Sequence, residues 1–264
     1  MELKAPAKVN WHLAVGPGRP DGYHPIASIF QTCTLCDVLD VEISAGPFRI
    51  DVFGLEGLCE KGCSTLDKAA LLWHEATGFD KAIRVRLTKN IPSQAGLGGG
   101  SSDAATLLLY LNGIAPVPMT RPDLMALGAK VGCDVPFFVS GYRAAAVSGL
   151  GEIVQEIVPR EDLRGFIIVT EGEKTSTREA YDALDGRAVI PPLDGACDME
   201  KLYNRPVREW TFRNDFDLVN SVPQIEVLEG ERLMLTGSGS CHVLLTDRKN
   251  LTLPPGVRAI GVSF

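Results

Sequence analysis

The chain has no long hydrophobic run. No stretch approaches the about 18 apolar residues that a membrane-spanning helix needs. The first residues, "MELKAPAKVNWHLAV", carry charge from the start and contain no continuous apolar core of the kind found in secretory signals. We therefore expect a cytoplasmic protein with no membrane partner.

Positive charge is also scarce. The sequence holds 26 Lys and Arg against 33 Asp and Glu, which gives a net charge of −7. Proteins that bind the nucleic-acid backbone usually present a basic surface, so we expect no nucleic-acid partner. An anionic small molecule must instead be held by local features, such as helix N-termini and single basic side chains.

Cysteine is too sparse for a disulfide framework, since the seven residues are an odd number spread along a fairly long chain. The spacings Cys33-x-x-Cys36 and Cys59-x-x-x-Cys63 raise the question of a zinc site. However, "IFQTCTLCDVLDVEI" reads as a strand entering a turn, and residues three apart on a strand point to opposite faces. We expect buried thiols rather than a metal centre.

The order of expected elements indicates an α+β fold with mixed strands rather than regular alternation. With 264 residues the chain fits one large domain or two smaller ones. We place a boundary near 150–163, which gives an N-terminal domain at 1–155 and a C-terminal domain at 156–264. The expected strands include 8–15, 26–33, 37–44, 48–54, 82–89, 143–152 and 164–172; the expected helices are 64–78, 102–113, 121–132 and 176–184; and 133–141 is expected to be a loop.

The segment "IPSQAGLGGGSSDAA" (91–105) has the properties of a phosphate loop. It lacks the lysine of a Walker A loop, and it fails the GxGxxG pattern because Ser101 stands where the last glycine belongs. Its four glycines allow positive φ and close backbone approach to a ligand. Ser101, Ser102 and Asp103 are good N-cap types, and a helix N-terminus can bind phosphate without any lysine. The alternative is a tightly packed glycine turn that only caps a helix.

Four stretches in order resemble the galacto-, homoserine, mevalonate and phosphomevalonate kinases (GHMP kinases). The loop at 91–105 resembles the P-x-x-x-G-L-G-S/G-S-S motif of this family. "APAKVN" (5–10) resembles its first motif, "LTGSGSC" (235–241) its third, and "VGCDVPFF" (131–138) the segment with the acidic catalytic residue. The resemblance implies a two-domain α+β kinase fold, with a left-handed βαβ-type nucleotide-binding domain and a smaller α+β C-terminal domain.

"RPDGYHPIASIFQ" (19–31) narrows the resemblance to one branch of that family. It is similar to the signature R-x-D-G-Y-H-x-L-x-T-x-F-Q of members that use ATP to phosphorylate the 2-hydroxyl of 4-diphosphocytidyl-2-C-methyl-D-erythritol in non-mevalonate isoprenoid biosynthesis. This small cytidine-diphosphate compound is therefore the implied substrate. An incidental polar hairpin turn is the alternative for Tyr23 and His24.

The resemblance implies a catalytic pair. Asp134 matches the family's acidic residue, and Lys8 matches a lysine that lies beside it in family members. A carboxylate there can accept the proton of the attacking hydroxyl or mainly orient that hydroxyl, and both roles are compatible with phosphoryl-transfer chemistry. The lysine can stabilise charge on the transferring group. Asn10 lies two residues further along a strand, faces the same side as Lys8 and is expected to contact the erythritol hydroxyls.

The co-substrate implied is ATP, with Mg²⁺ to neutralise its phosphates. The sequence shows no dedicated carboxylate cage, so the phosphates and the Ser102 hydroxyl are expected to hold the metal. Ser64 stands where the family usually has an adenine-contacting Asn at the start of a helix, which leaves recognition of the base least defined. The residues expected to bind ATP are Pro92, Gly96, Leu97, Gly98, Gly99, Gly100, Ser101, Ser102 and Ser64.

For the cytidine end, Tyr23, His24 and Phe30 match the family's base-recognition residues. Tyr181, in "STREAY", is expected either to stack on cytosine or simply to pack in its helix. Thr177 is expected near the phosphates, and Gly237 with Gly239 is expected to let the third motif approach the substrate or support the phosphate loop.

Other readings remain. The family's usual pattern before "STREAY" is replaced by "TEGEKTST" (170–177), and the second domain looks short, with a brief tail after the third motif. His12 is expected to be half-buried structure. A different acceptor specificity within the family, of the homoserine or mevalonate type, is one alternative function, and a non-catalytic nucleotide-binding protein on the same scaffold is another.

Overall fold

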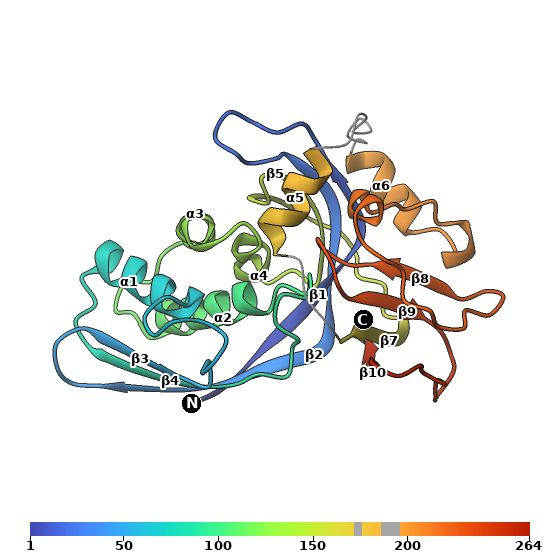
Figure 1. Ribbon diagram of the computed structural model, residues 1–264. Coiled ribbons are helices and arrows are strands. Elements are labelled where there is room, and N and C mark those ends of the chain that lie inside the picture. The colour runs from blue at the N-terminus through green and yellow to red at the C-terminus, as the bar shows by residue number, and fades with distance from the viewer. Residues whose placement is uncertain (172–175, 186–195) are drawn as a thin grey trace. The chain divides into compact units, whose positions relative to one another are not determined.

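The computed structural model describes residues 1–171, 176–185 and 196–264, which form two compact units (Figure 1). Unit 1 comprises residues 1–7, 35–93 and 98–142, and unit 2 comprises residues 8–34, 94–97 and 143–264. The strands β1 (Glu2–Val15) and β2 (Ile26–Ser44) pair with each other and contribute to both units. The expected α+β class is confirmed, whereas the domain boundary at 155/156 stays a prediction.

Unit 1 is built on a βαβ element. β3 (Arg49–Phe53) runs parallel to β4 (Ala82–Thr88), and helix α1 (Thr65–Thr77) connects them. The other edge of β4 pairs antiparallel with residues 38–44 of β2. Along β4, Ile83 and Val85 are buried while Arg84 and Arg86 are exposed, as the alternating sequence predicts for a half-buried strand.

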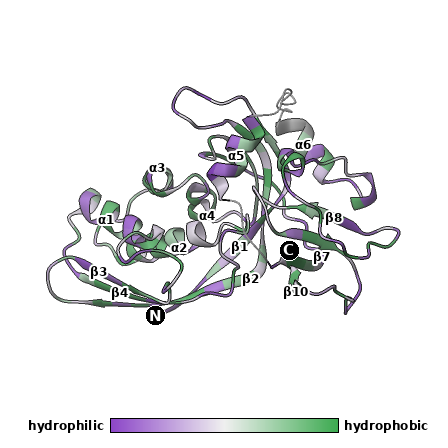
Figure 2. Ribbon diagram, viewed as in Figure 1, coloured by the Kyte–Doolittle hydropathy of each residue, from purple (hydrophilic) through white to green (hydrophobic). Residues whose placement is uncertain are grey.

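Three further helices complete unit 1. They are α2 (Gly99–Gly113), α3 (Arg121–Val131) and the short α4 (Val135–Ser140), whose residues are mostly hydrophobic (Figure 2). α2 packs against α1 and α4, and α3 packs against α4. Gly128 lets α3 and α4 approach, because a Cβ there would lie only 2.9 Å from Val135 Cγ1. The buried apolar side chains of these helices and of α1 include Leu66, Trp73, Leu107, Leu108, Leu111, Leu124 and Phe137.

Unit 2 contains an antiparallel four-stranded sheet in the order β10–β7–β9–β8. These strands are Val257–Ser263, Arg164–Thr170, His242–Leu245 and Arg232–Leu235. In addition, β5 (Ala144–Gly149) pairs antiparallel with residues 26–31 of β2 and with β6 (Ile153–Glu156). Its helices are α5 (Thr177–Asp185) and α6 (Ala196–Tyr203), followed by 3₁₀ turns at Val207–Glu209 and Asp215–Leu218.

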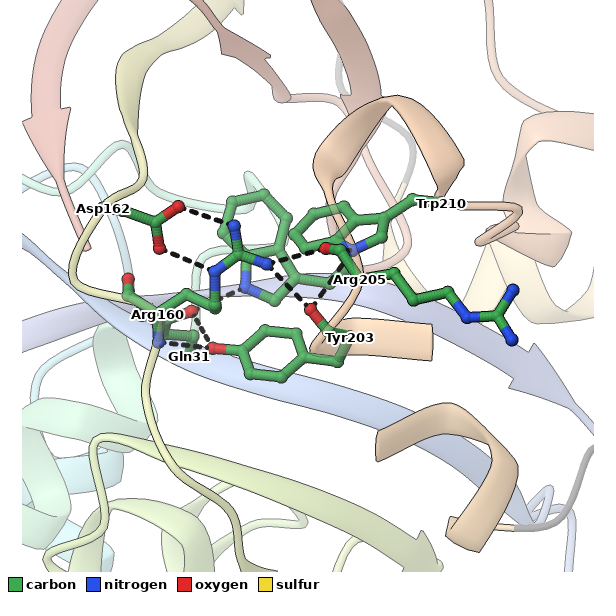
Figure 3. A network of polar contacts seen from close by, with 7 residues as sticks. Gln31, Arg160, Asp162, Tyr203, Arg205 and Trp210 are labelled. Carbon is green, nitrogen blue, oxygen red and sulfur yellow. Dashed lines mark hydrogen bonds and ion pairs between the residues drawn. The ribbon is translucent and has the colours of Figure 1, made fainter. Parts of the chain in front are cut away.

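An aromatic cluster with an internal polar network forms part of the core of unit 2 (Figure 3). The Trp11 ring lies 5.5 Å from that of Trp210. Gln31 Oε1 accepts hydrogen bonds from Trp11 Nε1 (2.9 Å) and from Tyr203 Oη (2.5 Å). Tyr203 Oη in turn accepts from the backbone N–H of Arg160 at 2.8 Å. Every buried donor in this chain of contacts has an acceptor, which is what permits polar groups inside a core.

Three expectations about secondary structure are wrong. Residues 26–33 and 37–44 form one continuous strand, so no turn follows Cys33. The segment expected to be a loop at 133–141 contains α4, which the sequence hides because all six of its residues are buried and show no amphipathic period. Helix α2 begins at Gly99 rather than residue 102.

In the described ranges, no helix has both the length and the apolar character needed to cross a bilayer.

Candidate active site

The second and third glycine motifs meet through their backbones in unit 2. A Cβ on Gly96 would lie 2.1 Å from the carbonyl oxygen of Thr236, and a Cβ on Gly237 would lie 2.5 Å from Gly96 Cα. Both glycines also have positive φ, 73° and 58°. The backbone N–H of Lys8 donates to Leu97 O at 3.0 Å and ties strand β1 to the same turn. Side chains at either glycine would therefore force the two motifs apart.

The rest of the loop forms the N-terminus of α2 in unit 1. Gly98 is the N-cap residue, with φ 70°, and no side chain caps the first N–H groups. The expectation that Ser101, Ser102 or Asp103 caps this helix is therefore wrong, because the helix begins at Gly99 and all three residues lie inside it. The uncapped N–H groups and the positive end of the helix dipole suit an anion.

Ser102 lies just inside α2 and has no solvent exposure of its own. Its Oγ atom is buried and has no hydrogen-bond partner in the described part of the chain. The neighbouring Ser101 is half-buried. A buried hydroxyl without a protein partner is unusual and is free to serve as a ligand.

A buried charge cluster supports the same helix end. Lys89 Nζ forms ion pairs with Asp37 Oδ2 and, at 3.3 Å, with Asp103 Oδ2. Asp37 Oδ1 also accepts from the backbone N–H groups of Asn90 (2.6 Å) and Ile91 (2.8 Å). Burial raises the pKa of Asp103 to about 7, although the charge of Lys89 opposes the shift. A Cβ on Gly99 would lie 3.0 Å from Lys89 Nζ, so the cluster packs directly against the first helical residue.

Lys8 and Asn10 are joined in unit 2. Lys8 is buried, its Nζ donates to Asn10 Oδ1 at 2.7 Å, and it lies 4.5 Å from the centre of the Phe30 ring. Asn10 Oδ1 also accepts from the backbone N–H of Gly237 at 3.0 Å. Asn10 Nδ2 donates to Ser28 Oγ at 2.9 Å. The structure thus brings four predicted site residues, Lys8, Asn10, Phe30 and Gly237, into one hydrogen-bonded and packed group.

Asp134 occupies the N-cap position of α4 in unit 1. Its side chain is half-buried and makes no cap hydrogen bond to that helix. The backbone N–H of Val135 donates to Gly132 O at 3.2 Å, which forms the tight turn that presents Asp134. The segment "GCDVP" therefore places this carboxyl at the start of a buried helix.

His24 and Tyr181 lie together in unit 2. Their ring centres are 4.9 Å apart, and Tyr181 also contacts Phe216 at 4.8 Å. His24 Nδ1 lies 3.0 Å from the carbonyl oxygen of Gly16. Tyr23 differs from its neighbour, since 55% of it is exposed while His24 is buried. Tyr181 therefore packs within unit 2 and contacts a predicted base-recognition residue at the same time.

The remaining predicted residues are distributed over both units. Thr177, at the start of α5, is exposed and lies 3.4 Å from Ser238 Oγ through its own hydroxyl. Ser64 is the N-cap of α1, and its hydroxyl takes part in a capping box with Asp67. Pro92 is half-buried, Leu97 is buried, and Gly239 has positive φ with Asn220 against it. His12 is buried more deeply than expected.

Sequence reasoning did not find Ser28, Thr236, Asp37 or Lys89. Ser28 had a usable signal, because it lies two residues before Phe30 on one strand and so shares its face. Thr236 stands inside the third motif, but nothing in the sequence indicates its contact with Asn10, since the two residues lie 226 positions apart.

Comparison with known proteins gives consistent matches. Residues 64–142 match the model of the GHMP kinase N-terminal domain. A 4-diphosphocytidyl-2-C-methyl-D-erythritol kinase from Thermotoga maritima is 35% identical over 274 aligned residues, covering 97% of this chain and 96% of that protein. The enzyme of the same name from Shewanella baltica is 30% identical and covers 90% of this chain and 82% of its own length.

Solved structures agree at the level of the fold. A crystal structure of 4-(cytidine 5'-diphospho)-2C-methyl-D-erythritol kinase superposes with a TM-score of 0.74 at 28% identity, covering 100% of both chains. A homoserine kinase from Cytophaga hutchinsonii gives a TM-score of 0.69 at 16% identity, covering 100% of this chain and 94% of that one. The second likeness concerns the fold alone.

Proposed function

The chain belongs to the 4-diphosphocytidyl-2-C-methyl-D-erythritol kinase family within the GHMP kinases, and we propose that it transfers the γ-phosphate of ATP to the 2-hydroxyl of 4-diphosphocytidyl-2-C-methyl-D-erythritol. The observation that carries the proposal is the similarity along almost the whole chain to relatives named for this compound. As a GHMP kinase it uses ATP as co-substrate. We further propose a cytoplasmic location, with no membrane or nucleic-acid partner, from the charge and hydropathy of the sequence.

In the proposed reaction, Asp134 accepts or orients the proton of the attacking hydroxyl, and Lys8 stabilises charge on the transferring phosphoryl group. Two features support these roles. Asp134 stands half-buried at the start of α4, in the tight turn closed by the hydrogen bond from Val135 N–H to Gly132 O. Lys8 is buried, and its ammonium is oriented by the hydrogen bond to Asn10 Oδ1. A buried, oriented ammonium group acts more strongly on a developing negative charge than an exposed one does.

The phosphates are proposed to lie at the N-terminus of α2. Its uncapped N–H groups and the backbone of Gly98, Gly99 and Gly100 can approach an anion closely. Lys89 lies behind this helix end, but its charge is matched by two carboxyl groups. The attraction for phosphate is therefore assigned to backbone dipoles rather than to a lysine in the loop.

A Mg²⁺ ion fits this helix end modestly. The buried, unpartnered hydroxyl of Ser102 is one oxygen ligand that a hard cation accepts. In the described ranges, no cluster of three His, Cys, Asp or Glu side chains is arranged to hold a metal. We propose that Ser102 and the ATP phosphates hold the ion, which would neutralise phosphate charge when bound.

For the cytidine end, we propose that His24 reads the polar edge of cytosine, while Tyr23 and Tyr181 supply aromatic surface. Stacking alone tolerates any base, so selectivity needs polar contacts. Both ring nitrogens of His24 already face Gly16 O and Asp185 Oδ2, so we assign these contacts to the backbone groups of His24. Tyr23 supports this view because more than half of the residue is exposed and accessible to a ligand. The parts assigned to Phe30, Thr177, Ser64 and Gly239 stay proposals.

A turnover assay with coupled ADP detection tests the function. The purified chain, ATP and Mg²⁺ are combined with the diphosphocytidyl compound, homoserine or mevalonate in parallel. We expect turnover with the diphosphocytidyl compound only. Lys8→Ala and Asp134→Ala are each expected to lower kcat by at least about a hundredfold. The matched surface variants Lys81→Ala and Asp51→Ala should retain wild-type kcat. Turnover of another acceptor, or full activity of the Asp134 variant, would contradict the proposal.

A further inference from the structure

The orientation of the Asn10 side chain depends on a residue that no role has been given, Ser28. Ser28 lies on β2 in unit 2 and is completely buried. Its hydroxyl hydrogen is donated to the carbonyl oxygen of His12. With that hydrogen used, Ser28 Oγ meets Asn10 only as an acceptor, at 2.9 Å from Nδ2.

This contact fixes which way the Asn10 amide points. Because Nδ2 faces Ser28, Oδ1 faces two close donors, the ammonium of Lys8 at 2.7 Å and the backbone N–H of Gly237 at 3.0 Å, with the Thr236 hydroxyl further away at 3.5 Å. A flipped amide would set its NH₂ group against both of those donors and its oxygen against Ser28, whose hydrogen points elsewhere. That arrangement loses three buried hydrogen bonds at once, and each loss costs about 1–3 kcal/mol.

Thr236 holds the backbone of Asn10. Its hydroxyl accepts from the backbone N–H of Asn10 at 3.0 Å, and it lies next to Gly237 in the third glycine motif. Ser28 therefore fixes the orientation of the Asn10 side chain, and the Asn10 oxygen in turn fixes the positions of the Lys8 ammonium and of Gly237 in the third motif.

We propose that Ser28 is a positioning residue for phosphoryl transfer: by fixing the Asn10 amide, it aims the Lys8 ammonium and holds the third glycine motif in register. The inference rests on the proposed function, in which Lys8 stabilises the transferring group. Ser28 does not touch substrate in this role and acts entirely through Asn10. A displacement of about 1 Å in a catalytic group can cost on the order of a hundredfold in rate.

The test compares two variants that differ only in the hydroxyl. S28T keeps the hydroxyl, and the family signature has Thr at this position. S28V has a methyl group in place of that hydroxyl. Both variants add one branch to the side chain, so crowding affects both equally. We expect S28T to keep kcat within about threefold of wild type and S28V to lose about ten- to hundredfold, with KM for ATP changed by less than about twofold. S28A is expected to resemble S28V.

The matched control is S140A. Ser140 is also buried, donates to a carbonyl (Phe137 O, 2.6 Å) and accepts from an N–H (Tyr142, 3.1 Å), but it belongs to unit 1, and both of its partners lie within its own segment. It should keep wild-type kcat. A double-mutant cycle tests whether Ser28 acts through Asn10. In an N10L background, S28A should cause little further loss of kcat, because the residue that Ser28 positions is already absent.

Equal kcat for S28T and S28V, or a full additional loss from S28A in N10L, would overturn the inference. If wild type itself turns over no acceptor, the proposed function fails, and the positioning is still decided by NMR of the isotope-labelled protein. S28V should then shift the side-chain amide signal of Asn10 and speed its hydrogen exchange, while S140A should not. An unchanged Asn10 signal in S28V would reject the role of Ser28.

Discussion

His24 and Asp185 face each other in unit 2, with 3.3 Å between Nε2 of the histidine and Oδ2 of the carboxylate. The other ring nitrogen of His24 lies 3.0 Å from Gly16 O. The imidazole ring is therefore held at both nitrogens, which fixes the plane that it presents to Tyr181. Asp185 is about half exposed, so its ion pair contributes little to the stability of the fold. Its role is to orient the His24 ring.

We expect Asp185→Ala to raise KM for the cytidine substrate about three- to tenfold, because His24 loses one of its two anchors. KM for ATP and the thermal midpoint Tm should stay at wild-type values. Asp182→Ala, one turn earlier on α5 and more exposed, is the control and should change neither constant. Steady-state kinetics with each substrate varied in turn decides the outcome, and an equal rise in both KM values would contradict the assignment.

Gly96→Ala tests the backbone contact between the second and third glycine motifs. The new Cβ would overlap the carbonyl oxygen of Thr236, and the residue would have to hold a φ of 73°. We expect a loss of at least about 2 kcal/mol in the free energy of unfolding, together with weaker ATP binding.

Gly113→Ala is the control for that substitution, since a Cβ there meets nothing within 4 Å. It lies at the end of a helix and should be neutral or slightly stabilising. Denaturant unfolding and isothermal calorimetry with ADP measure both quantities. Wild-type stability of Gly96→Ala would show that the two motifs are not packed as described.

Tyr203→Phe separates stability from activity. The hydroxyl accepts from Arg160 N and donates to Gln31, so its removal leaves a buried donor and a buried acceptor short of one partner each (Figure 3). We expect the free energy of unfolding to fall by about 1–3 kcal/mol while kcat is unchanged. Tyr110→Phe, a half-buried tyrosine in α2, should cost less. A drop in kcat at full stability would show that this network reaches the reaction.

The pH dependence of stability should report on His242. Burial lowers the pKa of this histidine from 6.5 to about 4. The unfolded chain therefore takes up a proton near pH 6.5 that the folded chain takes up only near pH 4. The contribution of His242 to the free energy of unfolding is therefore fully present above about pH 6.5. It is lost as the pH falls from about 6.5 to about 4, by about 3 kcal/mol in all.

His242→Gln cannot be protonated, so its free energy of unfolding should fall less steeply across that range than that of wild type. Urea unfolding at a series of pH values measures both slopes. The carboxyl groups titrate in both proteins and cancel in the comparison. Parallel slopes would mean that His242 takes up its proton equally well in the folded state.

Local signals predicted the local structure. Helix α1 was found because Ser64 and Gly78 mark its two ends, and the structure shows a capping box at one and a left-handed glycine at the other. Helix α4 was missed because "VPFFVS" is buried on all sides and offers no period. The start of α2 lies three residues earlier than expected, because Gly98 holds the N-cap position although Ser101, Ser102 and Asp103 are the stronger cap types.

The candidate site divides in the same way. The glycine motifs, Lys8 and Asp134 stand in recognisable local patterns, and their sequence alone suggested phosphate chemistry. The contacts of Asn10 with Ser28 and Thr236 depend on how distant strands meet, and no local pattern encodes them. Asn10 was expected to face substrate, yet its oxygen holds Lys8 and Gly237; how much it also contacts substrate stays a prediction.

The contact between Gly96 and Gly237 constrains how the gene can change. Most packed pairs drift during evolution by exchanging volume, as one side chain grows and its neighbour shrinks. Here neither partner has a side chain to give up, and each also needs a positive φ. A substitution at one position therefore cannot be compensated at the other. Both positions should remain glycine in descendants that keep this fold, however far the surrounding sequence diverges.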